Sequence, residues 1–307
     1  MESLKGRDLL SLADLNSNEI YSILQLAADM KAGKVQAECP TRVLGLLFQK
    51  ASTRTRVSFS VAMYQLGGQV LDLNTSVTQV SRGEPTIDTA RVLSRYLDVV
   101  AIRTFEQSEI QEFANYADIP VINALTDLEH PCQILADLLT VQEAFGTLSG
   151  LTLTYLGDGN NVAHSLMLGC ALVGMNVRLA CPKDYEPDAT VLEKAQKLAG
   201  DRSKVSVITD AKAAVADAQI LYTDVWASMG QENLADARLP VFQPYQINQA
   251  LLDKAEPDAI ILHCLPAHRG EEITAEVMEG KASRIWDQAE NRMHAQKALL
   301  ALVLGVA

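Results

Sequence analysis

The stretch of this sequence best suited to bind an anion is Ser52-Thr53-Arg54-Thr55-Arg56. It follows the apolar run 43–48, which is typical of a buried strand, and precedes apolar residues at a helical spacing over 57–64. Ser52 is therefore a predicted helix N-cap, and the first helical turn offers backbone N–H groups at the positive end of the helix dipole. Arg54 adds a planar guanidinium that suits phosphate. The alternative is an ordinary cap with solvated arginines, but five consecutive donors after a buried strand favour an anion site.

Further polar side chains follow other predicted strands. Arg103 follows the strand 99–102, and His130 and Gln133 flank Pro131, a residue type favoured in the first turn of a helix. A lone arginine at a strand end is usually solvated, and a lone histidine is usually packed among satisfied partners. The position of these residues at a helix N-terminus makes a pocket that binds an electrophile an equally good interpretation.

The run Gly157-Asp158-Gly159-Asn160-Asn161 raises the question of dinucleotide binding. The third glycine of G-x-G-x-x-G is replaced by Val162, and the end of the next strand, Cys181-Pro182-Lys183, offers no clear acid for a ribose. The sequence therefore disfavours NAD binding. The alternatives are a tight strand-to-helix turn, or a turn in which the Asn161 amide binds a small zwitterion.

Two more stretches follow predicted strands in the second half of the chain. Asp224 comes directly after one strand, before Ser228 and Met229, and its carboxylate can pair with an ammonium group. Cys264 follows the last predicted strand within His263-Cys264-Leu265-Pro266. A free cysteine is usually a small buried hydrophobe, but a place at the carboxyl end of a strand makes Cys264 a better candidate for chemistry than most cysteines.

Most of these residues follow predicted strands, so they can meet only if the carboxyl ends of several strands lie at the same edge of a sheet. Short apolar runs alternate with helical patterns along the chain, which indicates an α/β fold with mainly parallel sheets flanked by helices. The predicted strands cover 43–48, 70–73, 99–102, 120–123, 151–156, 177–181, 205–208, 220–223 and 259–263. The predicted helices cover about 16–31, 53–66, 86–96, 108–116, 131–145, 162–173, 189–199, 212–216, 246–254 and 286–304. A length of 307 residues favours two domains, with the hinge predicted at 146–150.

Composition limits the possible partners and the compartment. The net charge of −12 is opposite in sign to that of most nucleic-acid and anionic-membrane binders, so we expect neither partner. The five cysteines are odd in number and form no C-x-x-C pair, which argues against a disulfide framework and a thiolate zinc site. The first residues show no signal-peptide pattern, and no apolar run approaches membrane-spanning length, so the expected compartment is a reducing cytoplasm.

Taken together, these residues resemble those of the aspartate/ornithine carbamoyltransferase family, essentially from end to end. The residues 52–56, Arg103 and His130-Pro131-x-Gln133 are similar to the family's carbamoyl-phosphate motifs. The run Asp224-x-x-x-Ser228-Met229-Gly230 and the run His263-Cys264-Leu265-Pro266 resemble the ornithine branch, because an aspartate-specific relative would differ at both. The resemblance extends to residues 157–161 and to Glu290-Asn291-Arg292.

The resemblance implies two α/β domains, with the C-terminal helix returning to the first. A carbamoyl-phosphate-binding domain would cover 1–146 together with the helix 286–307, and an ornithine-binding domain would cover 147–285. The implied reaction transfers the carbamoyl group of carbamoyl phosphate to the side-chain amine of L-ornithine, giving citrulline and phosphate, with arginine biosynthesis favoured over arginine breakdown. Such enzymes act on these two small molecules as homotrimers or multiples of trimers and need no metal or organic cofactor.

The resemblance also implies roles for individual residues. The phosphate would be held by Ser52, Thr53, Arg54, Thr55 and Arg103. The carbonyl oxygen would be polarised by Arg103, Thr55 and His130, and the carbamoyl amide would be held by Gln133, Arg292 and the backbone near Leu265. Ornithine would be bound by Asn161, Asp224, Ser228 and Met229, with Cys264 beside its side-chain amine and next to the carbamoyl phosphate. The catalytic residues would be Arg103, His130, Asp224 and Cys264. Gln79, in the polar loop 74–85, matches a carbamoyl-phosphate-binding position that reaches a neighbouring subunit's site, where some relatives have histidine.

Three alternatives stand beside this interpretation. A carbamoyltransferase for another amine, such as putrescine or acylated ornithine, would be expected to lack the motif at 224–230, which is present. A regulatory or binding relative without catalysis would be expected to have lost Arg54, His130 or Cys264, and the chain retains all three. An NAD-dependent oxidoreductase is weakened by Val162.

Overall fold

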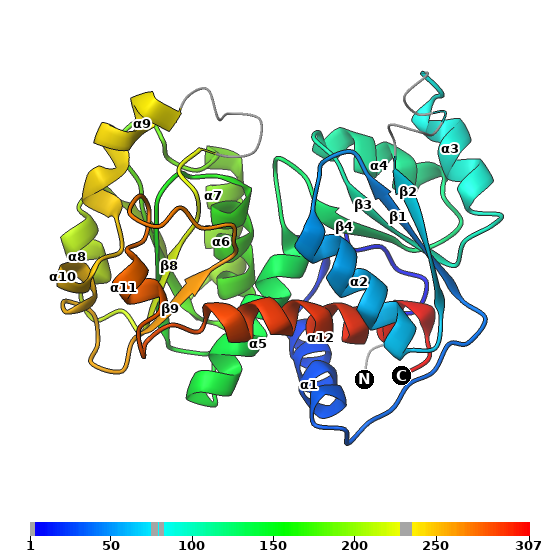
Figure 1. Cartoon of the computed structure of the whole chain (residues 1–307), viewed down its shortest axis with the longest axis horizontal. Helices are drawn as coiled ribbons and strands as arrows, with labels where there is room; N and C mark the ends of the chain where they lie inside the picture. The colour runs from blue at the N-terminus through cyan, green and yellow to red at the C-terminus, as the bar shows by residue number, and fades with distance from the viewer. Residues whose placement is uncertain (1–3, 75–78, 80–82, 228–234) are drawn as a thin grey trace. The chain divides into compact units, whose positions relative to one another are not determined.

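The computed structural model describes residues 4–74, 79, 83–227 and 235–307. The chain divides into two compact units: unit 1 consists of Met1–Leu139 with Asn291–Ala307, and unit 2 of Thr140–Glu290. Each unit contains one parallel sheet flanked by helices (Figure 1), as the alternation of strand and helix patterns predicts. Among the described residues, no helix combines the length and the apolar character that crossing a membrane requires.

Unit 1 begins with a short 3-10 helix and the helix α1, which precede its four strands. Asn16 caps α1 and forms a reciprocal capping box with Glu19, so α1 begins where the sequence predicts. In chain order the elements are η1 (Leu12–Asp14), α1 (Ser17–Lys31), β1 (Val43–Phe48), α2 (Thr53–Gln65), β2 (Gln69–Asn74), α3 (Thr86–Leu93), β3 (Val99–Arg103), α4 (Gln107–Tyr116), β4 (Val121–Leu125) and α5 (Pro131–Phe145), which continues into unit 2.

The sheet of unit 1 has the strand order β2-β1-β3-β4. The chain steps from β1 to β2 in one direction and then back across β1 to β3 and β4. Because crossovers between parallel strands are right-handed, α2 lies on one face of the sheet and α3 and α4 lie on the other. Apolar side chains that include Leu47, Ile102 and Phe113 pack α3 and α4 against the sheet. The direction of winding reverses between β1 and β3, which is where open α/β sheets bind ligands.

Unit 2 has a five-stranded sheet of order β7-β6-β5-β8-β9. The same handedness argument places α6 and α7 on one face and α8 to α10 on the other, and the winding reverses between β5 and β8. Apolar residues from α8, α10 and α11, among them Ala214, Leu251 and Val277, form one core with Leu221 and Ile261 of the sheet. The elements are β5 (Thr152–Leu156), α6 (Asn161–Val173), β6 (Asn176–Ala180), α7 (Ala189–Ala199), β7 (Val205–Ile208), α8 (Ala211–Val215), β8 (Ile220–Thr223), α9 (Ala235–Phe242), η5 (Gln243–Tyr245), α10 (Gln249–Leu252), β9 (Ile260–His263) and α11 (Ala275–Met278).

The last helix, α12 (Ile285–Leu304), returns to unit 1 as predicted. Its residue Asn291 accepts a hydrogen bond from Lys31 Nζ on α1 at 2.8 Å, and the Val303 carbonyl accepts the N–H of Gly6 at 2.9 Å. The predicted domain limits at 146 and 285, with the hinge at 146–150, stay predictions.

Two predicted helices are wrong in extent. The helix predicted over 86–96 ends earlier, at Leu93, where α3 is capped by Ser94. The segment 246–254 is not a single helix, because η5 ends before Gln246 and a new N-cap at Asn248 starts the separate helix α10. The Asn248 side chain accepts the N–H of Leu251 at 3.0 Å, which competes with continued helix on its N-terminal side. The helices α9 and α11 were not predicted from the sequence.

Candidate active site

The predicted anion-binding stretch lies where β1 leads into α2. Ser52 has an extended backbone, and its hydroxyl accepts the N–H of Thr55 at 3.2 Å, so it is the N-cap that the sequence predicts. The side chains of Thr53 and Arg54 are exposed beside the first turn of α2, whereas Thr55 is buried. Backbone N–H groups, hydroxyls and a guanidinium therefore gather at the positive end of a helix.

The two arginines of this stretch have different environments. Arg56 forms an ion pair with Asp72 on the neighbouring strand β2, and its guanidinium lies 5.4 Å from the centre of the Phe48 ring. Arg54 is exposed, and its charge acts on His130 by lowering the pKa of that histidine. Arg54 rather than Arg56 is therefore the guanidinium available to an anion.

The strand register brings three predicted residues to one edge of the unit 1 sheet. Phe48 at the end of β1 pairs with Arg103 at the end of β3, and Arg103 pairs with Leu125 at the end of β4. The Ser52 turn follows β1, and His130 follows β4. Because parallel strands end at the same edge, Ser52, Arg103 and His130 come from the carboxyl ends of three adjacent strands.

His130 is a buried histidine surrounded by positive charge. Burial is the largest cause that holds its pKa well below the usual 6.5, followed by the charges of Arg292, Arg103 and Arg54. The imidazole is therefore neutral at pH 7. It can donate one ring N–H to a carbonyl oxygen, while the three guanidiniums stabilise negative charge that develops on that oxygen.

We expect the stability of the protein to fall as the pH drops below about 6.5, in part because of His130. Below that pH this histidine binds a proton in the unfolded chain but not in the folded chain. The unfolded state therefore binds more protons, and the free energy of unfolding falls by up to about 1.4 kcal/mol per pH unit. Substitution of His130 by Gln should reduce this loss between about pH 7 and pH 5.5. Melting temperatures of both proteins across that range measure the effect, since other titrating groups are common to the two. Parallel pH curves would contradict the depressed pKa.

Arg292 joins three helices of unit 1. Its guanidinium donates to Thr55 Oγ1 on α2 at 2.9 Å and to Gln133 Oε1 on α5 at 2.6 Å. The Gln133 amide nitrogen donates in turn to Asp137 Oδ1 at 2.8 Å. Arg292, Thr55, Gln133 and Asp137 are all buried, so each holds the next in a fixed orientation. Four residues separated by up to 237 positions in the chain thus form one network.

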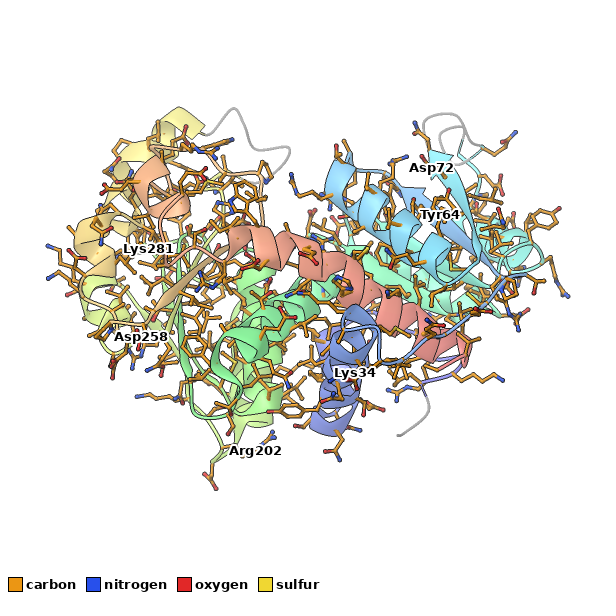
Figure 2. The ribbon with its side chains drawn as sticks, turned by 60° about the horizontal axis from the view of Figure 1, so that its bottom comes forward. Lys34, Tyr64, Asp72, Arg202, Asp258 and Lys281 are labelled. Carbon is orange, nitrogen blue, oxygen red and sulfur yellow. The ribbon has the colours of Figure 1, made fainter. Side chains whose placement is uncertain are left out.

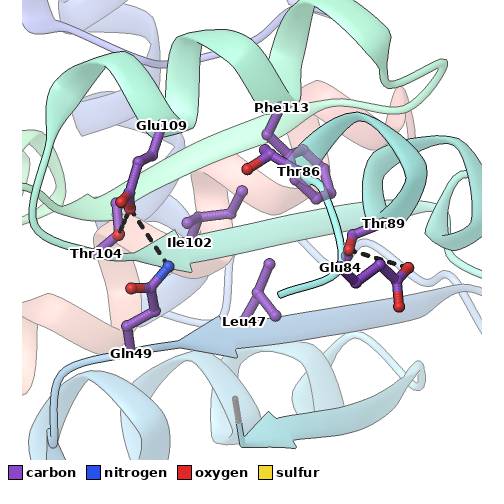
Figure 3. Close-up of a pocket in the computed structure, with 9 residues that line it drawn as sticks. All are labelled: Leu47, Gln49, Glu84, Thr86, Thr89, Ile102, Thr104, Glu109 and Phe113. Carbon is purple, nitrogen blue, oxygen red and sulfur yellow. Dashed lines mark hydrogen bonds between the residues drawn. The ribbon is translucent and has the colours of Figure 1, made fainter. Parts of the chain in front are cut away.

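A separate pocket on the α3 and α4 side of the unit 1 sheet has the wrong charge for phosphate (Figure 3). Its lining includes Glu84, whose carboxylate accepts from the Thr89 hydroxyl at 3.2 Å, and Glu109, whose carboxylate accepts from the Thr104 hydroxyl and from Gln49 Nε2. Two carboxylates repel an anion, so the cationic edge described above suits an anion better than this pocket does.

In unit 2, Asp224 is the centre of a second group of polar residues. Its Oδ2 accepts from Asn160 Nδ2 at 2.9 Å, and its Oδ1 accepts the N–H of Val225 at 2.8 Å and the thiol of Cys264 at 2.9 Å. Asn160 and Asp224 follow β5 and β8, the strands on either side of the reversal in winding. Asn161 is the first residue of α6 beside them, partly exposed. The predicted residues Asn161, Asp224 and Cys264 are therefore brought together.

The residue that caps α6 is Asn160, which sequence reasoning did not single out. Its Oδ1 accepts the N–H groups of Val162 and Ala163 at 3.0 and 3.1 Å, which leaves its amide nitrogen to face Asp224. An Asn immediately before an apolar helical pattern is a recognised N-cap signal, so the sequence did contain the information.

The backbone after β9 is held by a buried His263–Glu272 pair. The N–H of Leu265 donates to His263 Nδ1 at 2.9 Å, so the proton of this ring is on Nε2, which donates to Glu272 Oε1 at 3.0 Å. This contact supports Leu265 at a positive φ of 60° beside Cys264. Metal-ligating atoms of Asp224, His263 and Cys264 lie within 4.8 Å of one another, but both ring nitrogens of His263 are already used in hydrogen bonds.

Three predicted site residues are not placed in these groups. Gln79 is exposed, and its carbonyl accepts the N–H of Glu84 at 3.2 Å. Ser228 and Met229 lie outside the described residues. The binding roles of all three stay predictions.

Comparison with known proteins gives the family. The model of the aspartate/ornithine carbamoyltransferase carbamoyl-P binding domain matches residues 7–143, and that of the Asp/Orn binding domain matches residues 149–303. The ornithine carbamoyltransferase of Synechococcus sp. is 69% identical over 302 residues, which cover 98% of this chain and 99% of the relative.

Solved structures agree along the whole chain. The ornithine carbamoyltransferase of Pyrococcus furiosus is 49% identical with a TM-score of 0.96, covering 100% of both chains, and that of Gloeobacter violaceus is 57% identical with a TM-score of 0.90, covering 98% of this chain and 100% of the other. An anabolic ornithine carbamoyltransferase from Campylobacter jejuni is 36% identical with a TM-score of 0.92, covering 97% and 98%. Two family domains in the expected order and relatives that align from end to end leave one conclusion: this chain belongs to the aspartate/ornithine carbamoyltransferase family.

Proposed function

We propose that this chain transfers the carbamoyl group of carbamoyl phosphate to the side-chain amine of L-ornithine, giving citrulline and phosphate. The observation that carries the proposal is the contact between Asp224 and Cys264, residues of both ornithine-branch motifs, in a chain that is 69% identical to an ornithine carbamoyltransferase. A carboxylate next to a thiol suits a cationic amine that must lose a proton before it can react.

Unit 1 supplies the groups that bind and activate carbamoyl phosphate in this proposal. Arg54, Arg103, the hydroxyls of residues 52, 53 and 55 and the first-turn N–H groups of α2 hold the phosphate. Neutral His130 donates a hydrogen bond to the carbonyl oxygen. The surrounding guanidiniums stabilise the negative charge that this oxygen acquires in the tetrahedral intermediate.

Unit 2 supplies the groups that bind the acceptor. An amine like that of lysine has a pKa near ~10.4 in water, so at pH 7 it arrives as an ammonium and is not nucleophilic. Asp224 attracts this cation, and the amine then loses a proton, through desolvation or a transfer that involves Cys264. The neutral nitrogen attacks the carbonyl carbon, the C–N bond forms, and the C–O bond to phosphate breaks with its electrons leaving on the phosphate. The attacking nitrogen loses its second proton in the same sequence, and the departing phosphate accepts it.

An acceptor assay tests the proposed function. The purified chain with carbamoyl phosphate and ornithine should form citrulline, and putrescine, acylated ornithine or aspartate offered in its place should react at least about 100-fold less efficiently, as expected when a charged partner is lost or misplaced. If putrescine or acylated ornithine reacts best, the proposed acceptor is wrong, but the enzyme is still a carbamoyltransferase. No carbamoyl transfer to any of them would overturn the proposal.

We also propose that the enzyme acts in arginine biosynthesis in the cytoplasm as a homotrimer. The anabolic Campylobacter relative supports the biosynthetic direction. Exposed apolar side chains on α2 and β2, namely Val57, Tyr64 and Leu71, support burial against another subunit, and Figure 2 shows Tyr64 at the surface of α2. In such an assembly Gln79 would reach a neighbour's site, as the resemblance implies. Sedimentation equilibrium should give three times the 33.4 kDa mass of one chain, or a multiple of that value.

A further inference from the structure

Arg238 on α9 makes an unusually complete set of contacts for an arginine outside the predicted site. Its guanidinium donates to Asp158 Oδ2 at 2.7 Å and to the carbonyl of Trp226 at 2.5 Å. The same group lies 5.2 Å from the centre of the Tyr185 ring and 6.0 Å from that of Phe242. Its side chain is only 11% exposed, which indicates a pair desolvated enough to matter energetically.

The contacts of Arg238 join the two segments that carry the acceptor-binding group. Asp158 lies two residues before Asn160 in the turn after β5, and Trp226 lies two residues after Asp224 in the segment after β8. Asn160 and Asp224 are themselves hydrogen-bonded at 2.9 Å. Arg238 therefore holds both segments that carry this hydrogen bond: the turn with Asp158 and Asn160, and the segment with Asp224 and Trp226. Within the described residues, its own hydrogen bonds go to Asp158 and Trp226 rather than to Asp224.

The positive charge of Arg238 stabilises the carboxylate of Asp158, which lies near the carboxylate of Asp224. Burial raises the pKa of Asp158, the charge and hydrogen bond of Arg238 lower it, the charge of Asp224 raises it, and His164 lowers it. Without Arg238, the two carboxylates of Asp158 and Asp224 would repel each other across a largely buried turn. The segments that carry them would then move apart, or one carboxylate would bind a proton.

We propose that Arg238 is a positioning residue for the amino-acid acceptor: by holding Asp158 and the Trp226 carbonyl, it fixes Asn160 and Asp224 at the spacing that receives the acceptor's ammonium group. The inference rests on the proposed function. Arg238 contributes to recognition of the acceptor through these neighbours and does not itself touch the reacting atoms.

Kinetics of paired variants test the assignment. Arg238→Met keeps much of the apolar stem over the Tyr185 and Phe242 rings but removes the charge, and we expect it to raise the KM for ornithine at least about 10-fold. The calorimetric Kd for carbamoyl phosphate should stay within about 2-fold of the wild-type value, because the residues proposed to hold its phosphate belong to unit 1, whereas Arg238 and the two residues to which it donates belong to unit 2. Arg238→Lys should restore part of the loss, since it keeps the charge without the planar fork. Adding Asp158→Asn to Arg238→Met should also lower the KM for ornithine part of the way back to the wild-type value, because it removes the uncompensated carboxylate.

A matched control is available in the same unit. Arg178 also pairs with a carboxylate, Asp217 at 2.7 Å, and with a main-chain carbonyl, that of Ala216 at 2.6 Å. Among the residues that the structure describes, its hydrogen bonds go to residues 214–217 and not to the acceptor-binding group. Arg178→Met should therefore leave the KM for ornithine unchanged.

Three results would overturn the inference. The first is an Arg238→Met protein with wild-type melting temperature and wild-type ornithine KM. The second is equal loss of affinity for both substrates in step with a lower melting temperature, which indicates a structural role only. If Arg238→Met does not fold, Arg238→Lys decides: a selective rise in ornithine KM supports the inference and an unchanged KM overturns it. A wild-type chain that forms no citrulline would instead overturn the proposed function, before any variant is compared.

Discussion

Asp224→Asn should lower kcat/KM for ornithine by at least about 100-fold, the effect expected when more than one charge-assisted hydrogen bond is lost. The carboxylate accepts hydrogen bonds from three groups and donates none. In an amide of the same shape one oxygen becomes an NH2 group, which then faces either the Asn160 amide or the Val225 N–H and the Cys264 thiol, all of them donors already. Asn160 cannot rotate its amide to compensate without releasing the two N–H groups that its oxygen caps. The ammonium of ornithine also loses its counter-charge.

The affinity for carbamoyl phosphate should remain near that of the wild type, because the residues predicted to hold its phosphate lie in unit 1. Asp210→Asn is the control: Asp210 is an exposed N-cap of α8 in the same unit, where Asn serves equally well. Steady-state kinetics with each substrate varied in turn, with calorimetry for carbamoyl phosphate, separates the two effects. Wild-type ornithine kinetics in Asp224→Asn would show that the acceptor binds elsewhere.

Cys264→Ser examines how the amine loses its proton. The thiol donates to Asp224 at 2.9 Å, so the thiol and the carboxylate can share a proton with a bound ammonium. We expect the serine variant to lower kcat and to change the pH dependence of kcat between about pH 6 and pH 9, the range that brackets these titrations. If ornithine binds as a neutral amine and Cys264 only packs against it, the pH profile will not change.

The local parts of the site could be predicted from the sequence because their signals are local. An apolar run followed by Ser52 predicts a strand, a cap and a helix in that order, and all three are confirmed at β1 and α2. The handedness rule then gives the face on which each helix lies, but only once the strand order is known. That order depends on pairing between strands such as β1 and β3, separated by more than 50 residues, and no local pattern encodes it.

Two features of unit 1 could not be predicted for the same reason. Arg292 approaches Thr55 from 237 residues away, and only the packing of α12 on unit 1 makes that contact visible. The helical spacing of Val57, Val61 and Tyr64 predicts α2 but not its orientation: Val57 and Tyr64 are exposed, and the buried side chains of α2 include Phe59 and Met63. The spacing of apolar residues predicts a helix, but the surface against which the helix packs decides which of its faces is buried.

Arg54→Ala should weaken carbamoyl-phosphate binding by about 10- to 150-fold, which corresponds to ~1.5–3 kcal/mol for a lost charge-assisted hydrogen bond. The exposed Arg54 side chain lies at the N-terminus of α2, where its charge adds to the field of the first-turn N–H groups and the helix dipole. Loss of its field on His130 removes one of the causes that keep that imidazole neutral, so the pKa of His130 should rise towards its usual value. Turnover should therefore fall together with affinity.

Arg56→Ala is the control for this assignment, because it removes the same charge two residues later on the same helix. Its guanidinium is already paired with Asp72 and packed over Phe48, so its loss should cost stability and leave carbamoyl-phosphate affinity nearly unchanged. Arg54→Lys should fall between wild type and alanine, since it keeps the charge and loses the fork. Calorimetry of carbamoyl-phosphate binding to the folded proteins distinguishes the cases. Equal losses of affinity in Arg54→Ala and Arg56→Ala would indicate that both arginines act only through their positive charge. An unchanged Kd in Arg54→Ala would place the phosphate elsewhere.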